Sequence, residues 1–252
     1  MRLKEKVVVI TGGNSGIGFG IAQEFKDEGA VGAIVGRNQD KINTALEELG
    51  SGFIGINADV TNLENLEEVY KKTTDKFGKL DVLVVNAGGA IGPGTLGTVL
   101  DTTESDYMKM MSLNLKSVFF TVQKALPYLN DGSSIILVAS IAAHKAFPGM
   151  AVYSAAKAGV RSFARSFSAD LLDKNIKVNV LSPGTIETPV FGRMGLPDEA
   201  VSQAKEQFAN MIPIKRIGQP KEMGKVAVFL ASEDSSFIRG EEIIADGGVV
   251  NL

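Results

Sequence analysis

The sequence predicts an α/β fold: a doubly wound, seven-stranded parallel sheet with helices on both faces. Short apolar runs rich in β-branched residues alternate along the chain with longer segments of helical periodicity, which indicates βαβ units joined by right-handed crossovers. The apolar runs are hydrophobic almost without interruption, as is typical of strands in a parallel sheet that is covered on both faces. The length of 252 residues suits one large α/β domain.

Seven strands and six long helices follow from this alternation. We expect strands at residues 6–10, 32–36, 52–56, 81–85, 134–139, 177–181 and 241–245. We expect helices at residues 17–28, 39–49, 63–77, 105–129, 151–173 and 221–231, with a further helix near 198–210. No low-complexity linker, repeat or charged tail divides the chain, so residues 1–252 are expected to form a single domain. The longest insertion between regular elements, 185–219, is interpreted as a substrate loop or lid.

Composition excludes several classes of function. The formal net charge is −3 and no long run of Lys or Arg occurs, which argues against nucleic acid and anionic membranes as partners. The chain has no cysteine, so disulfides, thiolate nucleophiles and cysteine-ligated zinc are ruled out. His144 is the only histidine, so a multi-histidine metal site is impossible and a Ser-His-Asp hydrolase would depend on that residue alone. We expect no metal site.

The amino-terminal region indicates a soluble, cytoplasmic protein. Its apolar run, VVVI, is too short for the core of a signal peptide, and a glycine turn follows it directly. No segment approaches the roughly 20 apolar residues of a membrane-spanning helix. The lack of cysteine also fits a reducing compartment.

The stretch TGGNSGIGFG, directly after the first strand, predicts a dinucleotide site. Gly12, Gly16 and Gly18 have the spacing G-x3-G-x-G, in which one glycine makes a tight turn, one lets the backbone approach phosphates and one packs helix against strand. The helix that follows directs its N-terminus at the anion, as in a Rossmann-like fold. The alternative is an ordinary strand–helix turn with incidental glycines. The other turn residues expected to contact the cofactor are Asn14, Ser15 and Ile17.

The end of the second strand indicates which dinucleotide binds. An NAD-specific site would carry Asp or Glu about 20 residues after the turn, where it holds the ribose 2′-hydroxyl. The chain has Gly36 and then Arg37 there, so no carboxylate repels a 2′-phosphate and a guanidinium is available to bind it. A charge-assisted hydrogen bond contributes roughly 1.5–3 kcal/mol. NADP(H) is therefore favoured. NAD(H) stays open, because the glycine turn has no basic residue and Arg37 has an alternative interpretation as a solvated helix-start residue.

A phenol and an amine lie four residues apart in YSAAK, residues 153–157. Positions i and i+4 share one face of a helix, so Tyr153 and Lys157 are expected to meet. A free tyrosine has a pKa of about 10, and a nearby ammonium favours the phenolate, which makes tyrosine usable as an acid–base group. Ser140 ends the fifth strand, at the edge of the sheet where ligands bind. Its hydroxyl can polarise a carbonyl group.

These motifs resemble the short-chain dehydrogenase/reductase family. The resemblance spans almost the whole chain and is carried by TGGNSGIG, NAG (86–88), Ser140, Tyr153, Lys157, PGTIET (183–188) and DGG (246–248). It implies that the serine, tyrosine and lysine of this set are catalytic and that Asn114 completes a tetrad. The alternative for Asn114 is a polar residue with only a local backbone bond.

The resemblance also implies further cofactor contacts. Asp59 has an equal alternative as the N-terminal cap of the helix that follows it, and Thr188 has one as a simple loop threonine. His144 is interpreted as a loop residue near the mouth of the site, which the tyrosine mechanism does not need. The implied contacts are Asp59, Val60, Asn86, Ala87, Gly88, Tyr153, Lys157, Pro183, Gly184, Ile186 and Thr188.

The expected function is an NADP(H)-dependent oxidoreductase that transfers hydride between nicotinamide and a ketone or secondary alcohol, as a carbonyl or 3-oxoacyl reductase. An NAD(H)-dependent alcohol dehydrogenase and a non-catalytic NADP-sensing protein are the alternatives. An enoyl reductase is less favoured, because its tyrosine and lysine are more widely spaced. The resemblance implies a homotetramer. A small-molecule substrate with an apolar body is expected from Phe147, Met150, Val190, Phe191, Met194 and Leu196.

Overall fold

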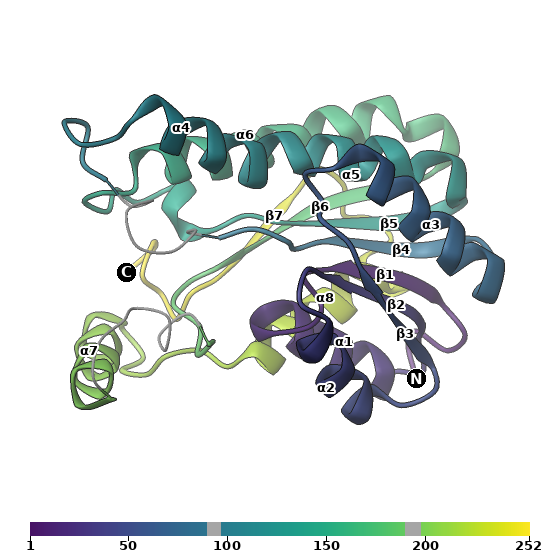
Figure 1. The fold of residues 1–252 in the computed structure, drawn as a ribbon, viewed down its shortest axis with the longest axis horizontal. Coiled ribbons are helices and arrows are strands. Elements are labelled where there is room, and N and C mark those ends of the chain that lie inside the picture. The colour runs from purple at the N-terminus through teal and green to yellow at the C-terminus, as the bar shows by residue number, and fades with distance from the viewer. Residues whose placement is uncertain (90–96, 190–197) are drawn as a thin grey trace.

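The computed structural model of the chain describes residues 1–89, 97–189 and 198–252. Within these ranges seven strands form one parallel sheet in the order β3-β2-β1-β4-β5-β6-β7 (Figure 1), which confirms the predicted Rossmann-like architecture. The strands are β1 (Val7–Thr11), β2 (Val31–Gly36), β3 (Phe53–Asn57), β4 (Leu80–Val85), β5 (Leu129–Val138), β6 (Lys177–Pro183) and β7 (Glu242–Ala245).

The chain winds outwards from β1 in both directions. It first adds β2 and β3 on one side, then crosses back to β4 and continues to β7 on the other. β1 therefore pairs in parallel with both β2 and β4. In an open sheet of this kind, ligands bind outside the carboxyl ends of the strands at the point where the strand order reverses. The reversal here lies between β1 and β4.

Helices cover both faces of the sheet (Figure 1). The helices α3, α5 and α6 share one core cluster with the sheet, and α1, α2 and α8 share the other. The helix α7 lies apart from the sheet (Figure 1). The bounds are α1 (Gly16–Asp27), α2 (Gln39–Leu49), α3 (Leu63–Phe77), α4 (Glu104–Met111), α5 (Ser117–Ala125), α6 (Ala151–Asp170), α7 (Asp198–Met211) and α8 (Pro220–Ala231).

Strand β1 shows why the strands are apolar without alternation. All five of its residues are buried. Val7 and Val9 pack in the core cluster of α3, α5 and α6, whereas Val8 and Ile10 pack in the cluster of α1 and α8. Successive side chains of a strand point to opposite faces, so a sheet covered on both faces needs apolar residues at every position.

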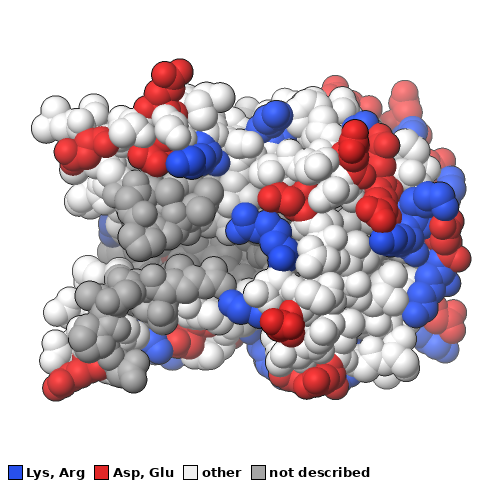
Figure 2. All heavy atoms as spheres, viewed as in Figure 1, with Lys and Arg blue, Asp and Glu red and all other residues white. Residues whose placement is uncertain are grey.

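Basic and acidic side chains are interspersed on the face seen in Figure 2. Among the described residues, no helix is long and apolar enough to cross a bilayer.

The helix expected at residues 105–129 is interrupted. A π-helical turn at Ser112–Lys116 separates α4 from α5, and the helical segment ends before Leu129, where β5 begins. Within the turn, Asn114 Nδ2 donates a hydrogen bond to the carbonyl oxygen of Met110 at 3.1 Å. Single π turns inside α-helices are frequent at functional sites. This one places the buried Asn114 beside Gly89, which follows β4.

The helices α1 and α8 pack closely because glycines lie at their contact. A Cβ on Gly20 would lie 2.4 Å from the carbonyl carbon of Pro220, and a Cβ on Gly224 would lie 2.6 Å from the carbonyl oxygen of Gly20. Backbone atoms cannot move aside as the end of a flexible side chain can. The close contact with α8 therefore fixes the position of α1, whose first turn carries the glycine motif.

We expect Gly20→Ala to lower the free energy of unfolding by roughly 1–3 kcal/mol, as overpacking does in a well-packed core. The matched control is Gly52→Ala, because the nearest atom to an added Cβ there is a side-chain carbon of Val31 at 3.7 Å. Urea unfolding followed by circular dichroism measures both variants. Equal unfolding midpoints for the two variants would show that the contact between α1 and α8 has room for a methyl group.

Candidate active site

The glycine turn joins β1 to α1, and its glycine positions have no room for a side chain. Gly12 and Gly16 have φ angles of +66° and +55°, in the left-handed region that favours glycine. A Cβ on Gly18 would lie 2.3 Å from the carbonyl oxygen of Gly12. The backbone is therefore bare where the chain enters α1.

Thr11 and Asn86 join this turn to the end of β4. The buried Oγ1 of Thr11 accepts hydrogen bonds from the N–H groups of Asn86 at 3.0 Å and Ala87 at 3.1 Å. Asn86 Nδ2 donates in return to the carbonyl oxygen of Thr11 at 3.0 Å. These bonds set the spacing of the two strands where the sheet order reverses. Sequence reasoning missed Thr11, although a polar residue at the end of an otherwise apolar strand is a signal for it.

The side chain of Asn14 occupies the space beside Gly36, the last residue of β2, where an acidic side chain would otherwise lie. A Cβ on Gly36 would lie 2.5 Å from the Cγ of Asn14. Gly36 therefore makes room for a side chain of the glycine turn, and an acidic residue at this position would displace that side chain. The structure adds a steric reason for the absence of an acid at the end of β2.

Arg37 and Asp59 face each other beyond the ends of β2 and β3. Arg37 Nη1 lies 3.9 Å from Asp59 Oδ2, and the arginine side chain is 65% exposed. Asp59 Oδ1 accepts hydrogen bonds from the N–H and the hydroxyl of Thr61 at 2.9 and 2.7 Å. The alternative interpretation of Asp59 as a helix cap is wrong, because Asn62 caps α3 by accepting from two N–H groups of its first turn. The side chain of Val60 is buried in the core.

Asn114 is buried and fastened to the loop after β4. Its Oδ1 accepts from the N–H of Gly89 at 2.7 Å, and its Nδ2 donates to the carbonyl oxygen of Gly89 at 3.1 Å. These bonds cross 25 positions of the chain, so Asn114 does more than make a local backbone bond. A Cβ on Gly88 would lie 2.9 Å from Asn114 Oδ1 and 3.3 Å from Lys157 Nζ. Gly88 therefore lets the two side chains approach each other.

Ser140, Tyr153 and Lys157 converge at the carboxyl end of β5. Lys157 Nζ donates to the carbonyl oxygen of Val138 at 2.9 Å and lies 5.7 Å from the centroid of the Tyr153 ring. Ser140 lies close enough to Tyr153 for its side chain to lower the pKa of the phenol. Ser140 Oγ also accepts from the N–H of Ala142 at 3.1 Å. The tyrosine and lysine of YSAAK share one face of α6, as their spacing predicts.

Burial sets the acid–base properties of this group. Burial raises the pKa of Tyr153, and the nearby side chain of Ser140 lowers that pKa in part. Burial lowers the pKa of Lys157 from 10.5 to about 8, because desolvation disfavours the charged form of an amine. The surroundings hold Tyr153 as a neutral phenol and bring the titration of Lys157 towards neutral pH.

The segment after β6 crosses the glycine turn. A Cβ on Gly16 would lie 3.2 Å from the Cγ2 of Thr188, so Thr188 lies against the turn. Ile186 is 6% exposed and packs in the core, while its main chain pairs with Gly218 in an isolated bridge. The side chain of Ile186 therefore contributes mainly to packing, and the part of this segment nearest the turn is Thr188.

The motif DGG packs against the end of β6. Pro183 ends that strand, and a Cβ on Gly184 would lie 2.7 Å from the Cα of Asp246. The carboxylate of Asp246 accepts from the N–H groups of Gly248 and Val250, both at 2.8 Å. The aspartate thus shapes the C-terminal turn, and the two following glycines have φ angles of +68° and +93°.

A cavity of about 500 Å³ is lined by residues 97–99, 142–149, 151 and 154, among them His144 and Phe147. Part of its wall begins two residues after Ser140 in the chain and includes the neighbour of Tyr153, but no tetrad residue lines it. His144 thus lines a cavity whose wall begins just after Ser140. Of the other expected apolar pocket residues, Met150 precedes α6. Outside the described residues lie Val190, Phe191, Met194 and Leu196.

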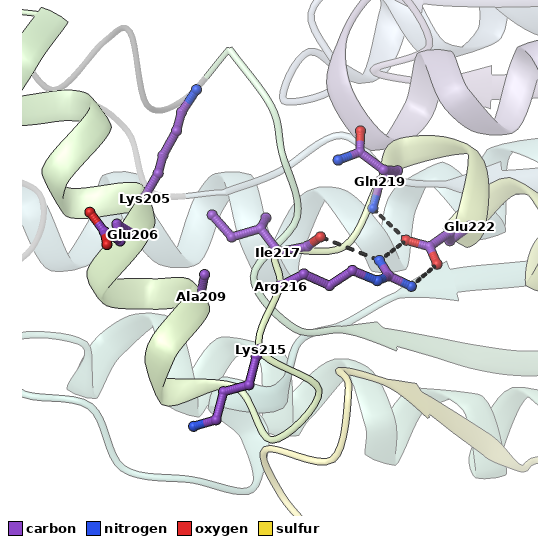
Figure 3. A pocket seen from close by; sticks show the side chains of 8 residues that line it. All are labelled: Lys205, Glu206, Ala209, Lys215, Arg216, Ile217, Gln219 and Glu222. Atoms are coloured by element: carbon purple, nitrogen blue, oxygen red, sulfur yellow. Dashed lines mark hydrogen bonds and ion pairs between the residues drawn. The ribbon is translucent and has the colours of Figure 1, made fainter.

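The second cavity, of about 670 Å³, lies between α7 and the start of α8 (Figure 3), and no tetrad residue lines it. The guanidinium of Arg216 in its wall is bound by both carboxylate oxygens of Glu222 at 2.8 and 2.7 Å (Figure 3). This ion pair holds the pKa of Glu222 at about 2, chiefly through the bond from Arg216. The charges of Arg216 and Glu222 therefore neutralise each other within the cavity wall.

The glycine turn fits the pyrophosphate of a dinucleotide. Ser15 precedes α1 but makes no side-chain cap, and the first turn of the helix has no acidic residue. The N–H groups at a helix start attract anions when no side chain satisfies them. The described residues contain no group of three or more His, Cys, Asp or Glu side chains able to hold a metal ion.

Comparison with known sequences points to one family. The family model described as enoyl-(acyl carrier protein) reductase matches residues 12–250. Oxidoreductase asL5 of Sarocladium schorii is 40% identical over 254 residues, which cover 100% of this chain and 98% of the relative. The 3-oxoacyl-(acyl-carrier-protein) reductase FabG of Thermotoga maritima is 37% identical, with coverage of 99% and 100%.

Solved structures agree with this assignment. A short-chain dehydrogenase/reductase of unknown function from Caenorhabditis elegans, solved with cofactor, superimposes with a TM-score of 0.93 at 35% identity, covering 99% of this chain and 96% of that chain. A short-chain dehydrogenase/reductase from Serratia marcescens gives a TM-score of 0.88 at 28% identity, with coverage of 99% and 100%. The chain belongs to the short-chain dehydrogenase/reductase family of nicotinamide-dependent oxidoreductases.

Proposed function

We propose that the protein is an NADP(H)-dependent reductase that transfers hydride between nicotinamide and a ketone or secondary alcohol, with Tyr153 as the acid–base group. The observation that carries this proposal is the convergence of Ser140, Tyr153 and Lys157 at the end of β5, next to Gly88. The bound cofactor supplies or accepts the hydride. The residues of the chain bind the substrate oxygen and move its proton.

Each member of the tetrad has a distinct role in this mechanism. Ser140 Oγ binds the carbonyl oxygen, and the hydroxyl of Tyr153 donates a proton to that oxygen as it gains alkoxide character. Because the two side chains lie close together, both hydroxyls can reach one substrate atom. The ammonium of Lys157 stabilises the phenolate that remains. Asn114 holds the backbone of Gly89, and so the loop beside the reacting groups.

NADP(H) is the proposed cofactor because the end of β2 is cationic. Gly36 and Asn14 leave no place for an acid, and Arg37 is exposed. Asp59 faces Arg37 at 3.9 Å, but an exposed ion pair contributes only about 0–1 kcal/mol. A charge-assisted bond to a 2′-phosphate contributes roughly 1.5–3 kcal/mol and outweighs it. The use of NAD(H) is the alternative, and Asp59 favours it by partly neutralising Arg37.

The proposed substrate is a small carbonyl compound with an apolar body. The cavity of about 500 Å³ after Ser140 is lined in part by Val99, Phe147 and Pro148. The Thermotoga maritima relative is by name a 3-oxoacyl-(acyl-carrier-protein) reductase, so a 3-oxoacyl thioester is one such compound. Enoyl reduction, named by the family model, is less supported because Tyr153 and Lys157 lie only four residues apart. Residues 185–219 are the proposed substrate loop.

We also propose that the enzyme assembles as a homotetramer through α5 and α6. Phe119 of α5 makes edge-to-face contacts with Phe120 of the same helix and with Phe163 of α6, and all three stay only partly buried in the single chain. Light scattering of the purified protein should give the mass of four chains. A monomer mass would contradict the assembly and leave the chemistry of the site unchanged.

We expect Tyr153→Phe to lower kcat for carbonyl reduction by about 100-fold to 10,000-fold, because the general acid is lost. NADPH affinity should stay near that of the wild type, as measured by cofactor fluorescence. The matched control is Tyr107→Phe, since Tyr107 is an exposed tyrosine of α4. Retention of the wild-type rate in Tyr153→Phe would exclude Tyr153 as the acid.

We expect Arg37→Gln to weaken NADPH binding by about 10-fold to 100-fold and to change NADH binding little. Asp59→Asn should act in the opposite direction and tighten NADPH binding by up to about five-fold, because a competing charge beside Arg37 is removed. Side-by-side titrations with the two cofactors measure both effects. An equal loss of NADPH and NADH affinity in Arg37→Gln would contradict a phosphate-reading role.

A further inference from the structure

Glu242 begins β7, the edge strand of the sheet, and its carboxylate is the centre of a polar cluster outside the tetrad. The side chain is only 11% exposed. The carboxylate receives hydrogen bonds from Ser182 Oγ at 2.5 Å, from His144 Nε2 at 2.8 Å and from Arg161 Nε. A buried carboxylate needs such bonds and an opposite charge to offset its lost hydration.

The hydrogen-bond directions in this cluster follow from the carboxylate. An ionised carboxylate only accepts hydrogen bonds, so His144 carries a proton on Nε2 and Ser182 donates through its hydroxyl. Burial raises the pKa of Glu242, but the bonds from Ser182, His144 and Arg161 outweigh burial and leave the pKa below its ordinary value. Glu242 is therefore an anion at neutral pH.

Two of the three donors belong to the elements that carry the catalytic residues. His144 follows the 3-10 turn Ile141–Ala143, whose N-cap is Ser140, and its backbone N–H donates to the first residue of that turn at 2.9 Å. Arg161 lies on α6, one helical turn beyond Lys157, in the helix that also carries the tyrosine. One carboxylate thus holds both the serine-bearing turn and the tyrosine-bearing helix.

The third donor anchors the carboxylate to the sheet. Ser182 lies on β6, near its carboxyl end, and β6 pairs with β7 through Val180 and Glu242. The cluster therefore joins the turn and α6 to two neighbouring strands. Such an anchor can set the relative position of two elements, whereas a bond between two mobile side chains could not.

We propose that Glu242 is a positioning residue for the reaction: it braces the turn of Ser140 against α6 and so maintains the approach of Ser140 to Tyr153. The inference rests on the proposed function, because it assigns this approach a role in proton transfer. Hydrogen bonds weaken steeply when distance or angle departs from the optimum. A small displacement of the turn relative to α6 would therefore be felt at the phenol of Tyr153.

The proposal predicts that neutralising Glu242 raises the pKa of Tyr153, whereas loss of the negative charge alone would lower that pKa. The side chain of Ser140 lowers the pKa of Tyr153, so moving Ser140 away raises the pKa. Removal of the negative charge of Glu242 alone would act in the opposite direction, because a nearby anion disfavours the phenolate. A rise in the Tyr153 titration after neutralisation of Glu242 therefore reports that Ser140 has moved away from Tyr153.

The test compares Glu242→Gln with Glu241→Gln. Glu241 is the exposed neighbour, so the control makes the same change of charge at almost the same place. The chain has only four tyrosines, so ¹³C-labelled tyrosine gives a simple NMR spectrum, and Tyr153→Phe assigns the resonance of interest. We expect Glu242→Gln to move the titration of Tyr153 upwards by about 0.4–1 pH unit, the equivalent of one hydrogen bond, and Glu241→Gln to leave it in place.

Kinetics provide the second measurement. In alcohol oxidation Tyr153 must be ionised, so the rising limb of kcat against pH should shift upwards in Glu242→Gln. At neutral pH kcat should fall about three-fold to ten-fold, because a pKa that rises by about 0.4–1 unit lowers the ionised fraction of Tyr153 by that factor. The KM for the cofactor should stay constant. His144→Ala breaks only the link to the turn and should move the titration in the same direction. It replaces Glu242→Gln if that variant does not fold.

The two proposals fail in distinguishable ways. If the wild-type protein turns over no carbonyl or alcohol, the proposed function fails, while the NMR titration still tests the brace. If Glu242→Gln and His144→Ala leave the Tyr153 titration unchanged or move it downwards, the brace is wrong whatever the activity. A lower melting temperature without a shifted titration would make Glu242 a residue of stability only, and it would also overturn the proposal.

Discussion

A buried ammonium is the constraint on which the arrangement of this site depends. Lys157 is 3% exposed, and burial lowers its pKa from 10.5 to about 8. Between those values the folded chain binds fewer protons than the unfolded chain, so stability rises with pH across that window. Below pH 8 the destabilisation is present in full. At neutral pH the buried ammonium of Lys157 therefore lowers the free energy of unfolding. The packing of the core on both faces of the sheet must offset this loss.

The positions without side chains follow from the same crowding. Gly88 lies where a Cβ would meet both Asn114 and Lys157, and Gly36 lies where it would meet Asn14. Neither residue has a positive φ angle, so glycine is needed there for space rather than for backbone conformation. Gly88 thus lets side chains from two helical segments approach each other, and Gly36 makes room for a side chain of the glycine turn. Removing that space would displace these side chains rather than the backbone.

The elements that sequence predicts well are those whose determinants are local. The apolar runs, the glycine turn and the spacing of Tyr153 and Lys157 are local patterns, and the structure has each of them. The π-helical turn is not a local pattern, because it accompanies bonds between Asn114 and Gly89, 25 residues away. The polar cluster around Glu242 joins positions far apart in the chain, and no spacing within one element reveals it.

Asp59 shows a different kind of limit. An acidic residue before a helix fits the pattern of a cap, and Asn62, three residues later, fits it equally well. Only the backbone path decides between them, since Asn62 has the extended conformation of an N-cap and accepts from the first turn of α3. Asp59 is left to bind Thr61 and to face Arg37, a pairing across two strand ends that the sequence does not show.

The two ends of the proposed cofactor site differ in a way that would separate cofactor preference from catalysis. At the β2 end the charged groups are Arg37 and Asp59, which are exposed and 3.9 Å apart, so water and salt screen their interaction. At the β5 end the groups are Ser140, Tyr153 and Lys157, of which the lysine is buried and bonded to the backbone of Val138. A change of charge at the exposed end alters binding energy without moving neighbours. A change at the buried end leaves polar groups without partners, so it alters structure and chemistry together. If the proposed roles hold, single substitutions at the exposed end would change the preference for a phosphate, whereas substitutions at the buried end would disturb several groups of the tetrad together.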